Sequence, residues 1–365
     1  MRSMLTRQMC LLGLASLAHS VSPLERRDSS GAGYDTSRLG PDNANCQRQT
    51  YQLAVSSNNI VFQGVDSNAN TTVVTSLFQD FLSSSTNFTQ QYEAPNKQQV
   101  SNTYSLSGTL CTPKSGAKNA AHVQLLVHGV GFDSSYWDFV ADGSEDYSYV
   151  RAAADAGYTT FRYDRLGTGL SEKPNDAYNV VQSPTDLAIL TEFSQMLRSG
   201  AIGGQAFSKI VGVGHSYGSV QLQALTASAP TAIDAVLLQG FSKNGTAMPP
   251  FLAGGAYTTA TYVFPDRFPT SELSNAYVVT GTPYSDQFNF FYFPYFSDGA
   301  FQRARATEQP ATQGVLFSQT AIMGSADSFT GPVHVDSKYP NIPAYVKELY
   351  PAVKDFTTYI PANTG

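Results

Sequence analysis

Short apolar runs alternate with longer segments of helical periodicity along the middle of the chain. The runs are rich in β-branched, aliphatic and aromatic residues and end at turn-forming or polar residues, as buried strands do. The expected strands are 123–127, 159–163, 210–213 and 235–238, and the expected helices are 147–156, 185–197 and 218–227. Strands and helices that alternate in this way predict an α/β fold, with a mostly parallel central sheet flanked by helices.

The segment before this core has a different pattern. Residues 51–62 and 104–112 alternate between apolar and polar positions and predict two further strands. Between them, 72–82 has helical periodicity, and 83–100 is polar enough to predict a loop. We therefore expect the N-terminal part of the core to extend over 51–240.

After Gly240 the alternation stops. Residues 241–328 contain Pro, Gly and a dense aromatic run from Phe288 to Phe296, which predicts a lid inserted into the core. Over 329–365 the core pattern resumes weakly and looks incomplete. The expected elements there are a strand at 333–335, a helix at 342–349 and a strand at 356–360.

The first residues predict a secretory signal peptide at 1–20. Arg2 and Arg7 precede a short apolar stretch, and small residues follow near a cleavage point. The apolar stretch is shorter than the roughly 20 residues that cross a bilayer, and no later segment is long and apolar enough. Residues 21–50 are rich in Gly, Ser, Asp and Asn and predict a linker or pro-segment. The dibasic pair Arg26–Arg27 is either a processing site or an exposed pair on this tail.

Secretion agrees with two other features, which are acceptor sequences and cysteines. Asn70, Asn87 and Asn244 each begin an Asn-x-Thr glycosylation acceptor sequence. Cys46 and Cys111 are the cysteines beyond the signal region, and in an oxidising compartment they predict one disulfide. The alternative is two buried free thiols. Neither cysteine has metal-ligand spacing, and we expect no metal site.

Composition limits the partners of the chain. Of its 365 residues 42% are hydrophobic and 14% charged, with a formal net charge of −6. This balance allows a sizeable core and argues against global disorder. Because no run of Lys or Arg is present to neutralise phosphates, we expect no nucleic-acid partner. The sequence does not predict an oligomeric state.

The segment Gly214-His215-Ser216-Tyr217-Gly218 lies between a predicted strand and a predicted helix. A serine between two such glycines, on a sharp strand-to-helix turn, is held above the sheet as a nucleophile. The alternative is a tight turn with a capping serine. His215 is adjacent to Ser216 on a sharp turn, so their side chains point apart and His215 is not expected to act as base.

Two backbone N–H groups should stabilise the oxyanion that forms when a serine attacks a carbonyl. We expect one from Tyr217, directly after the nucleophile. The other is expected from Val130, in the His-Gly-Val-Gly segment that begins at His128, with Gly131 as the alternative donor. His128 is expected to brace this loop.

A third motif runs from Asp164 to Ser171, and Asp164 is expected to order its loop through backbone hydrogen bonds. Together with the two previous motifs it resembles the α/β-hydrolase fold superfamily, and the signal peptide and lid resemble a secreted fungal serine-hydrolase branch. The resemblance covers about 122 to the C-terminus. It implies a Ser nucleophile, an acid and a His base in that order along the chain.

The sequence does not complete this triad. Asp336 is the best acid, at the end of a strand that looks shortened, and Asp327 is a weaker choice. His334 alone follows Ser216 among the histidines, and it precedes the acid, so the base is not found. The family's base would follow the strand at 356–360. Either the deduced sequence lost segments, which we favour, or the protein lost its base.

These motifs predict a secreted serine hydrolase that cleaves carboxylic esters or lactones through an acyl-enzyme at Ser216, without a cofactor. The expected partner is a small-molecule substrate. The alternative is a catalytically impaired or non-catalytic small-molecule-binding member of the same fold; a peptidase also stays open. The aromatic lid favours a substrate with a bulky apolar or aromatic part, unless its rings form the lid's own core.

Overall fold

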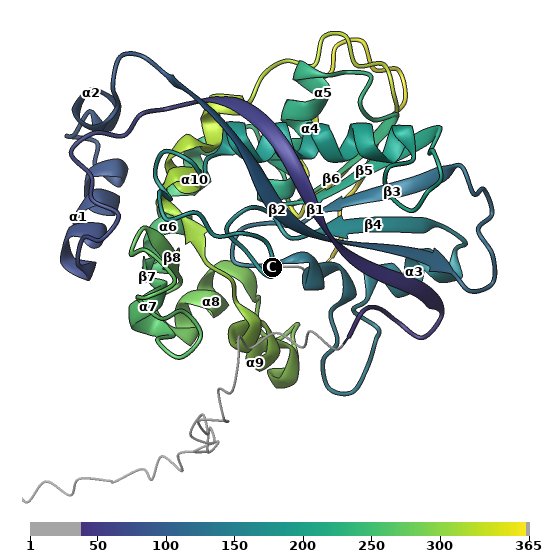
Figure 1. Ribbon diagram of the computed structural model, residues 1–365, viewed down its shortest axis with the longest axis horizontal. Coiled ribbons are helices and arrows are strands. Elements are labelled where there is room, and N and C mark those ends of the chain that lie inside the picture. Colours follow the sequence, from purple (N-terminus) through teal and green to yellow (C-terminus); the bar gives the residue numbers. More distant parts are fainter. Residues whose placement is uncertain (1–37, 363–365) are drawn as a thin grey trace, which may run out of the picture.

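A computed structural model describes residues 38–362 of the chain. The expected signal peptide, the pair Arg26–Arg27 and most of the expected linker lie outside these residues. The described part is built on an eight-stranded sheet in the order β1-β2-β4-β3-β5-β6-β10-β11 (Figure 1). Its strands are β1 (Ala44–Asn59), β2 (Gln98–Pro113), β3 (His122–Val127), β4 (Thr159–Tyr163), β5 (Lys209–His215), β6 (Ala235–Gln239), β10 (Val333–Asp336) and β11 (Phe356–Tyr359).

The sheet is mostly parallel, as predicted. From β4 across to β11 every neighbouring pair is parallel, whereas β1 and β2 are antiparallel to each other and β2 is antiparallel to β4. The carboxyl ends of the parallel strands therefore meet at one edge of the sheet, which is where α/β proteins bind their ligands.

Helices cover both faces of this sheet. Helices α4 (Ser183–Ser199) and α5 (Tyr217–Ser228) pack on one face, and α3 (Tyr149–Asp155) packs on the other (Figure 1). In β3, Leu125 belongs to the larger core cluster with the α4 side chains, while Leu126 belongs to a smaller cluster with α3. Successive strand residues face opposite sides, so both faces of the sheet are apolar.

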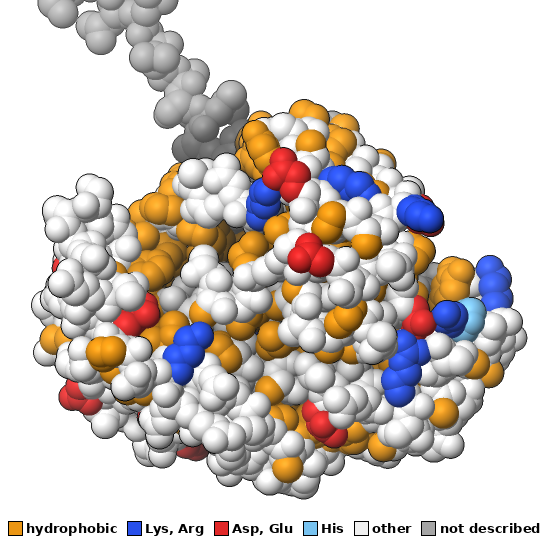
Figure 2. Space-filling view, turned by 90° about the horizontal axis from the view of Figure 1, so that it is seen from above, with side chains coloured by type: hydrophobic (Ala, Val, Ile, Leu, Met, Phe, Trp, Pro, Cys, Tyr) orange, Lys and Arg blue, Asp and Glu red, His pale blue; other side chains and the backbone are white. Residues whose placement is uncertain are grey.

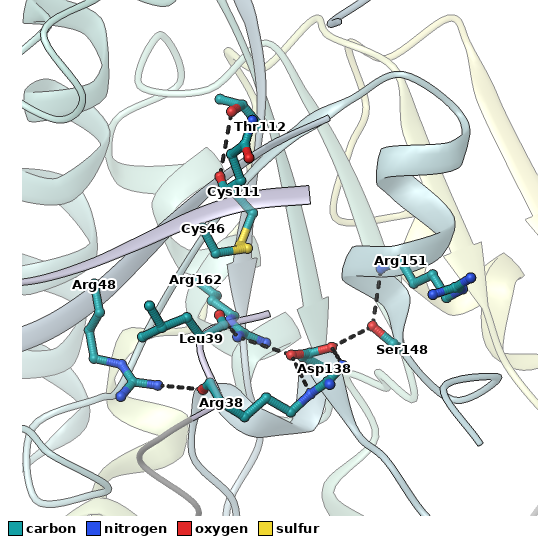
Figure 3. Close-up of a disulfide and its surroundings, with 11 residues drawn as sticks. Arg38, Leu39, Cys46, Arg48, Cys111, Thr112, Asp138, Ser148, Arg151 and Arg162 are labelled. Atoms are coloured by element: carbon teal, nitrogen blue, oxygen red, sulfur yellow. Dashed lines mark hydrogen bonds and ion pairs between the residues drawn. A yellow bond between two sulfur atoms is a disulfide. The ribbon is translucent and has the colours of Figure 1, made fainter. Parts of the chain in front are cut away.

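Strand β1 begins earlier than the sequence pattern predicted. The stretch expected to be linker up to residue 50 includes Ala44, which starts β1 and pairs with Pro113 of β2. Cys46 and Cys111 are partners in this register and form a disulfide (Figure 3), so the expected pairing is confirmed. This part of β1 has many exposed polar residues and is held by backbone pairing with β2. It therefore lacks the apolar alternation from which strands are predicted.

Residues between β6 and β10 form an insertion at the place of the predicted lid, and it has its own small sheet of strands β7-β8-β9. We call this insertion the lid. Its elements are η2 (Gly245–Ala247), α6 (Met248–Gly255), β7 (Thr258–Thr259), α7 (Ala260–Val263), β8 (Tyr277–Val279), α8 (Pro283–Phe290), α9 (Asp298–Thr307), β9 (Ala311–Thr312), α10 (Gln313–Ser318) and η3 (Gln319–Ile322). The sequence did not predict this second sheet, because its strands are too short to show alternation.

The expected loop between β1 and β2 contains helix α2 (Phe88–Tyr92), and the preceding helix α1 (Thr71–Leu82) is close to its predicted bounds. Both helices lie beside the lid in Figure 1. The Phe78 ring stacks on Tyr257 and meets Phe317 edge-on, with centroids 6.0 and 5.5 Å apart. The lid therefore packs against the helical segment between β1 and β2.

The surface is mixed in charge. On the face drawn in Figure 2, basic and acidic side chains are interspersed among uncharged ones. Within residues 38–362 no helix combines the length and apolar character required to cross a bilayer. The remaining helix, α11 (Ile342–Lys347), and a 3-10 turn η1 (Ser134–Asp138) complete the described fold.

Candidate active site

Ser216 occupies a strained turn between β5 and α5. Its φ is +53° and its ψ is −117°, a conformation that costs a non-glycine residue about 1–3 kcal/mol. A Cβ added to Gly218 would lie 2.0 Å from the carbonyl oxygen of Val127, and one added to Gly214 would lie 2.7 Å from the Gly218 backbone. The two flanking glycines are therefore required for the turn. This is the strand–turn–helix geometry of a serine nucleophile elbow.

The loop after β3 lies directly against the nucleophile. A Cβ added to Gly129 would be 3.2 Å from the Ser216 Cβ, so this loop passes within contact distance of the serine. The N–H of Val130 has no acceptor among residues 38–362. Tyr217 is the first residue of α5, and the first N–H groups of a helix have no partner within it. Both expected oxyanion donors are thus beside Ser216.

A buried polar network holds this loop. The backbone N–H of Arg165 donates to His128 Nε2 at 3.1 Å, so His128 is protonated on Nδ1, which lies 2.9 Å from the Gly129 carbonyl oxygen. Burial lowers the pKa of His128 well below its usual range and keeps it neutral. Its predicted bracing role is confirmed.

Arg165 extends the network to the helices. Its guanidinium donates to Gly129 O at 3.2 Å and to Asp186 of α4 at 3.0 Å, and both charged side chains are almost fully buried. The Tyr217 hydroxyl donates to the same Asp186 carboxylate at 3.0 Å. Burial raises the pKa of Asp186, and Arg165 acts against that rise. One ion pair therefore positions both sides of the expected oxyanion site.

Asp164 has the loop-ordering role predicted for it. Its two carboxylate oxygens accept hydrogen bonds from the backbone N–H groups of Ser134 at 2.9 Å and Leu170 at 2.8 Å. Neither Asp164 nor Asp133 beside it lines the cavity at Ser216. Burial and the charge of Asp164 raise the pKa of Asp133 to about 7. Because both carboxylates accept backbone N–H groups of the loop and neither lines the cavity, this pair stabilises the loop.

A cavity of about 790 Å³ opens beside Ser216. Its lining comes from three parts of the chain, namely the segment 132–152, the ends of β5 and β6, and the lid helices α6, α8 and α9. That volume suits a small organic molecule. The cavity opens at the carboxyl edge of the sheet, where α/β proteins bind their ligands.

His215 lines this cavity but is not arranged as a base. Its ring stacks on Tyr136, with centroids 4.5 Å apart and an interplanar angle of 17°. Burial lowers the pKa of His215 to about 4, and its Nδ1 has no hydrogen-bond partner in the described residues. The ring is therefore a neutral, flat part of the cavity wall.

Asp336 ends β10 at the same edge of the sheet as Ser216. The register places His215, Gln239, Asp336 and Tyr359 in one row across the ends of β5, β6, β10 and β11. Gln239 donates through Nε2 to Asp336 Oδ2 at 3.3 Å, and Gln239 also lines the cavity. Asp336 is thus one side chain away from the cavity, which is compatible with its predicted role as the acid.

His334 is brought to Asp336 but not to Ser216. Its Nε2 lies 2.9 Å from Asp336 Oδ1, and its Nδ1 lies 2.7 Å from the Thr357 hydroxyl of β11. It does not line the cavity. Asp327 lies six residues before β10, accepts a hydrogen bond from the Ser325 hydroxyl and does not line the cavity. Within the described residues, no histidine occupies the position of the base.

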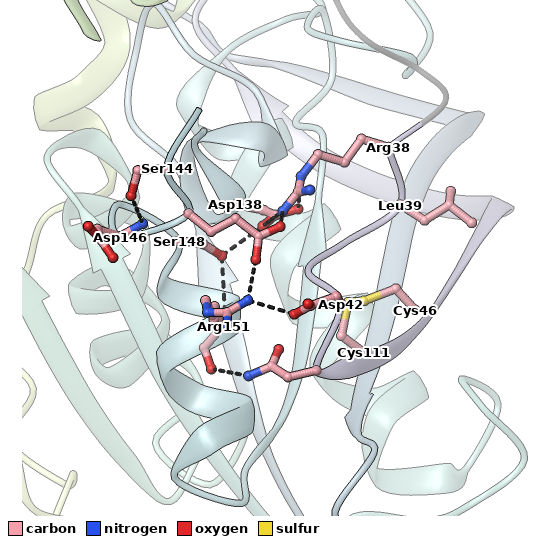
Figure 4. Close-up of polar contacts among 12 residues, drawn as sticks. Arg38, Leu39, Asp42, Cys46, Cys111, Asp138, Ser144, Asp146, Ser148 and Arg151 are labelled. Carbon is pink, nitrogen blue, oxygen red and sulfur yellow. Dashed lines mark hydrogen bonds and ion pairs between the residues drawn. A yellow bond between two sulfur atoms is a disulfide. The ribbon is translucent and has the colours of Figure 1, made fainter. Parts of the chain in front are cut away.

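The cavity floor is anchored by a charged cluster that the sequence did not predict. Asp138, at the end of η1, accepts hydrogen bonds from Arg38 at 3.2 and 3.1 Å (Figures 3 and 4) and from Arg162 at 3.4 Å (Figure 3). The turn η1 carries Tyr136 and Trp137 into the cavity wall. The cluster therefore fixes two rings of the site to β4 and to the N-terminal segment.

The three expected glycosylation residues are exposed and lie at helix starts. Asn70, Asn87 and Asn244 each accept a backbone N–H through the side-chain oxygen. They are N-caps in this structure whether or not they carry glycans. In the described part of the chain, no group of His, Cys, Asp and Glu side chains is arranged to hold a metal ion.

A model of the Alpha/beta hydrolase family matches residues 124–355, and the chain belongs to this family. Among solved structures, a hydrolase from Pseudomonas aeruginosa PA01 is 14% identical over 71% of this chain and 86% of that chain, with a TM-score of 0.46. A putative hydrolase from Rickettsia typhi is 10% identical over 87% of this chain and 92% of that chain, with a TM-score of 0.48. The enol-lactonase from Burkholderia xenovorans LB400 is 16% identical, with 72% and 89% covered and a TM-score of 0.40. No curated protein matches the sequence.

Proposed function

We propose that this chain is a serine hydrolase that cleaves carboxylic esters or lactones through an acyl-enzyme on Ser216. The observation that carries the proposal is the strained elbow at Ser216, which faces a loop with an unpartnered N–H at Val130. The strained backbone at Ser216 costs folding free energy that a glycine at the same position would not. Such strain is typical of functional sites. No cofactor or metal is part of the proposal.

The chemistry follows from the geometry. Ser216 Oγ attacks the carbonyl carbon, and the N–H groups of Val130 and Tyr217 stabilise the negative oxygen of the tetrahedral intermediate. The alcohol leaves, an acyl-enzyme stays on Ser216, and water releases the acid. Each oxyanion donor is worth about 3–4 kcal/mol of barrier in enzymes of this kind. The Ser216 hydroxyl proton must pass to a base and then to the leaving alcohol; no histidine among residues 38–362 occupies that position, and Asp336 is the proposed acid of the triad.

A second candidate is a small-molecule-binding protein with little or no turnover. It is favoured by one observation, that Ser216 Oγ makes no hydrogen bond to a base within residues 38–362. Without a base, an enzyme of this type retains only a residual acceleration of about 10³–10⁴ over water, from its oxyanion site and binding. The cavity would serve both candidates.

The test is hydrolysis of p-nitrophenyl butyrate by the purified protein, compared with Ser216→Ala. Ser199→Ala, at an exposed position near the end of α4, is the matched control. We expect Ser199→Ala to retain the wild-type rate and Ser216→Ala to fall to the uncatalysed rate. Equal rates for wild type and Ser216→Ala would reject the hydrolase and leave the binding protein.

Secretion is also part of the proposal. The Cys46–Cys111 disulfide and the exposed amides of Asn70, Asn87 and Asn244 support it, because such bonds persist mainly outside the cytosol. Protein recovered from the medium of a eukaryotic host should lose mass on treatment with an N-glycosidase. Retention of the protein inside the host cells, without glycans, would contradict secretion.

A further inference from the structure

Aromatic rings make up most of the wall of the cavity beside Ser216. Of the described residues, no Leu, Ile, Val or Met side chain lines it, and the aliphatic part of the lining consists of Ala152, Ala300 and Ala304. Branched and flexible aliphatic side chains, which fill ordinary apolar pockets and adapt to alkyl chains, are thus missing from this wall. A wall of rings offers flat faces and polarised edges instead, which favour offset-stacked and edge-to-face contacts with another ring.

The rings nearest the nucleophile come from the core and from the lid. Phe132 follows the oxyanion loop, and Phe290 ends helix α8 of the lid. Their rings meet edge-to-face, with centroids 5.5 Å apart and an interplanar angle of 71°. Phe251 of α6 meets Phe290 at 5.8 Å and 79°. Phe132 also contacts Tyr136 and His215, with centroids 5.2 and 6.4 Å away, so the rings of the lid are continuous with the Tyr136–His215 stack.

Phe290 has a particular position in this set. A Cβ added to Gly131 would lie 3.9 Å from Phe290 Cζ, so the tip of the ring reaches the loop that supplies the Val130 N–H. A substrate whose carbonyl oxygen sits at that N–H would therefore lie close to the tip of the Phe290 ring. Rings farther out, such as Phe293 at 74% exposed, lie outside the lining.

The cavity near the nucleophile is also uncharged. Asp146 is the one charged side chain of the lining, and it is exposed. Buried charges need partners, and a charged substrate group would find none in the lining beside Ser216. Asp336, which is bonded to Gln239, and Lys338, 4.3 Å from the centre of the Tyr292 ring, lie outside the lining. The occupant is therefore neutral next to the reacting bond.

We propose that this site selects neutral esters or lactones that carry an aromatic ring in the acyl or alcohol part, and that Phe290 is a specificity-determining residue. This inference rests on the proposed function for its chemistry, but ring selection can be measured without turnover. Each edge-to-face pair contributes about 0.5–1.5 kcal/mol beyond area burial. A saturated chain of equal size loses this contribution.

The first test measures binding to the Ser216→Ala variant. Trp137 is the one tryptophan of the chain and lines the cavity, so its fluorescence reports occupancy directly. The ligands are 2-phenylethyl acetate and octyl acetate, which have equal numbers of carbon and oxygen atoms. Octyl acetate is the more apolar of the two and would bind tighter in a pocket governed by hydrophobicity alone. We expect 2-phenylethyl acetate to bind at least about threefold tighter; equal or tighter binding of octyl acetate overturns the inference.

The second test uses Phe290→Leu, with Phe293→Leu as the matched control on the same part of the lid. We expect the ratio of kcat/KM for the aromatic over the aliphatic ester to fall about tenfold in Phe290→Leu and to stay unchanged in Phe293→Leu, because one or two ring contacts are lost. An unchanged ratio in Phe290→Leu overturns the role of Phe290. If wild type shows no turnover, the hydrolase proposal fails separately, and the same ratio is then taken from the Trp137 binding constants.

Discussion

The buried pair Arg165–Asp186 offers a quantitative test of how the oxyanion loop is held. The perturbation is Asp186→Asn, which keeps the size of the side chain and removes its charge. Arg165 and Asp186 side chains are 2% and 1% exposed, and an arginine cannot discharge itself by losing a proton. The variant therefore leaves a charged guanidinium buried without a counterion.

Removing one partner of a buried ion pair costs about 3–5 kcal/mol. The Tyr217 hydroxyl also loses a charged acceptor, which places the expected cost in the upper half of that range. For a chain of this size the entropy of unfolding is about 0.7 kcal/mol per kelvin. We therefore expect the melting temperature to fall by roughly 5–7 °C.

The assay is urea or thermal unfolding followed by circular dichroism, with Glu348→Gln as control. Glu348 pairs with Lys243 and is 62% exposed, so its loss should cost less than about 1 kcal/mol. A double variant, Arg165→Met with Asp186→Leu, should recover much of the lost stability, because apolar residues often replace a buried pair without loss. The reasoning is refuted if Asp186→Asn is no more destabilising than Glu348→Gln.

Three further predictions follow from the same structure. Gly218→Ala should not yield soluble folded protein, whereas Gly245→Ala, where an added Cβ meets nothing, should express normally; equal yields would contradict the elbow geometry. Because burial lowers the pKa of His215 to about 4 from 6.5, the unfolded state binds its proton first as the pH falls. Stability should then be lost from about pH 6.5 down through pH 4, by up to about 1.4 kcal/mol per pH unit, and His215→Phe should flatten that slope in urea titrations. Replacing Cys46 and Cys111 by Ala opens a loop of 65 residues and should lower the free energy of unfolding by about 4 kcal/mol; a loss below about 1 kcal/mol would contradict the entropic estimate.

The local motifs of the site could be predicted from the sequence. Ser216 and its two glycines form one short continuous segment, and the loop at Val130 forms another. The chemistry of each motif can therefore be recognised locally. His128 could be assigned a bracing role because its place beside the loop left little room for proton transfer. The parallel order of the sheet also followed from the alternation of strands and helices.

Other parts depend on contacts between distant segments. Tyr136 and Trp137 enter the cavity because the Arg38–Asp138 cluster fixes η1, and no local pattern marks that turn. Gln239 reaches Asp336 because of strand register. The short strands of the lid gave no periodic signal.

The aromatic run of the lid had two interpretations at the level of sequence, and the structure contains both. Phe291 packs on Phe296 within the lid, with centroids 5.2 Å apart, and both rings also line the cavity. Phe288 and Phe293 are largely exposed. Composition alone could not separate these positions, because the direction of each ring is set by the fold of α8 and the segment after it.

The central claim is that Ser216 is the nucleophile of a hydrolase, and covalent trapping tests it most directly. The purified protein is treated with a neutral aryl phosphonate, digested and mapped by mass spectrometry, with Ser216→Ala in parallel. The account predicts one phosphonate adduct, on the peptide that contains Ser216, and none on the variant. Absence of an adduct on that peptide, or an equal adduct on another serine in both proteins, would contradict it.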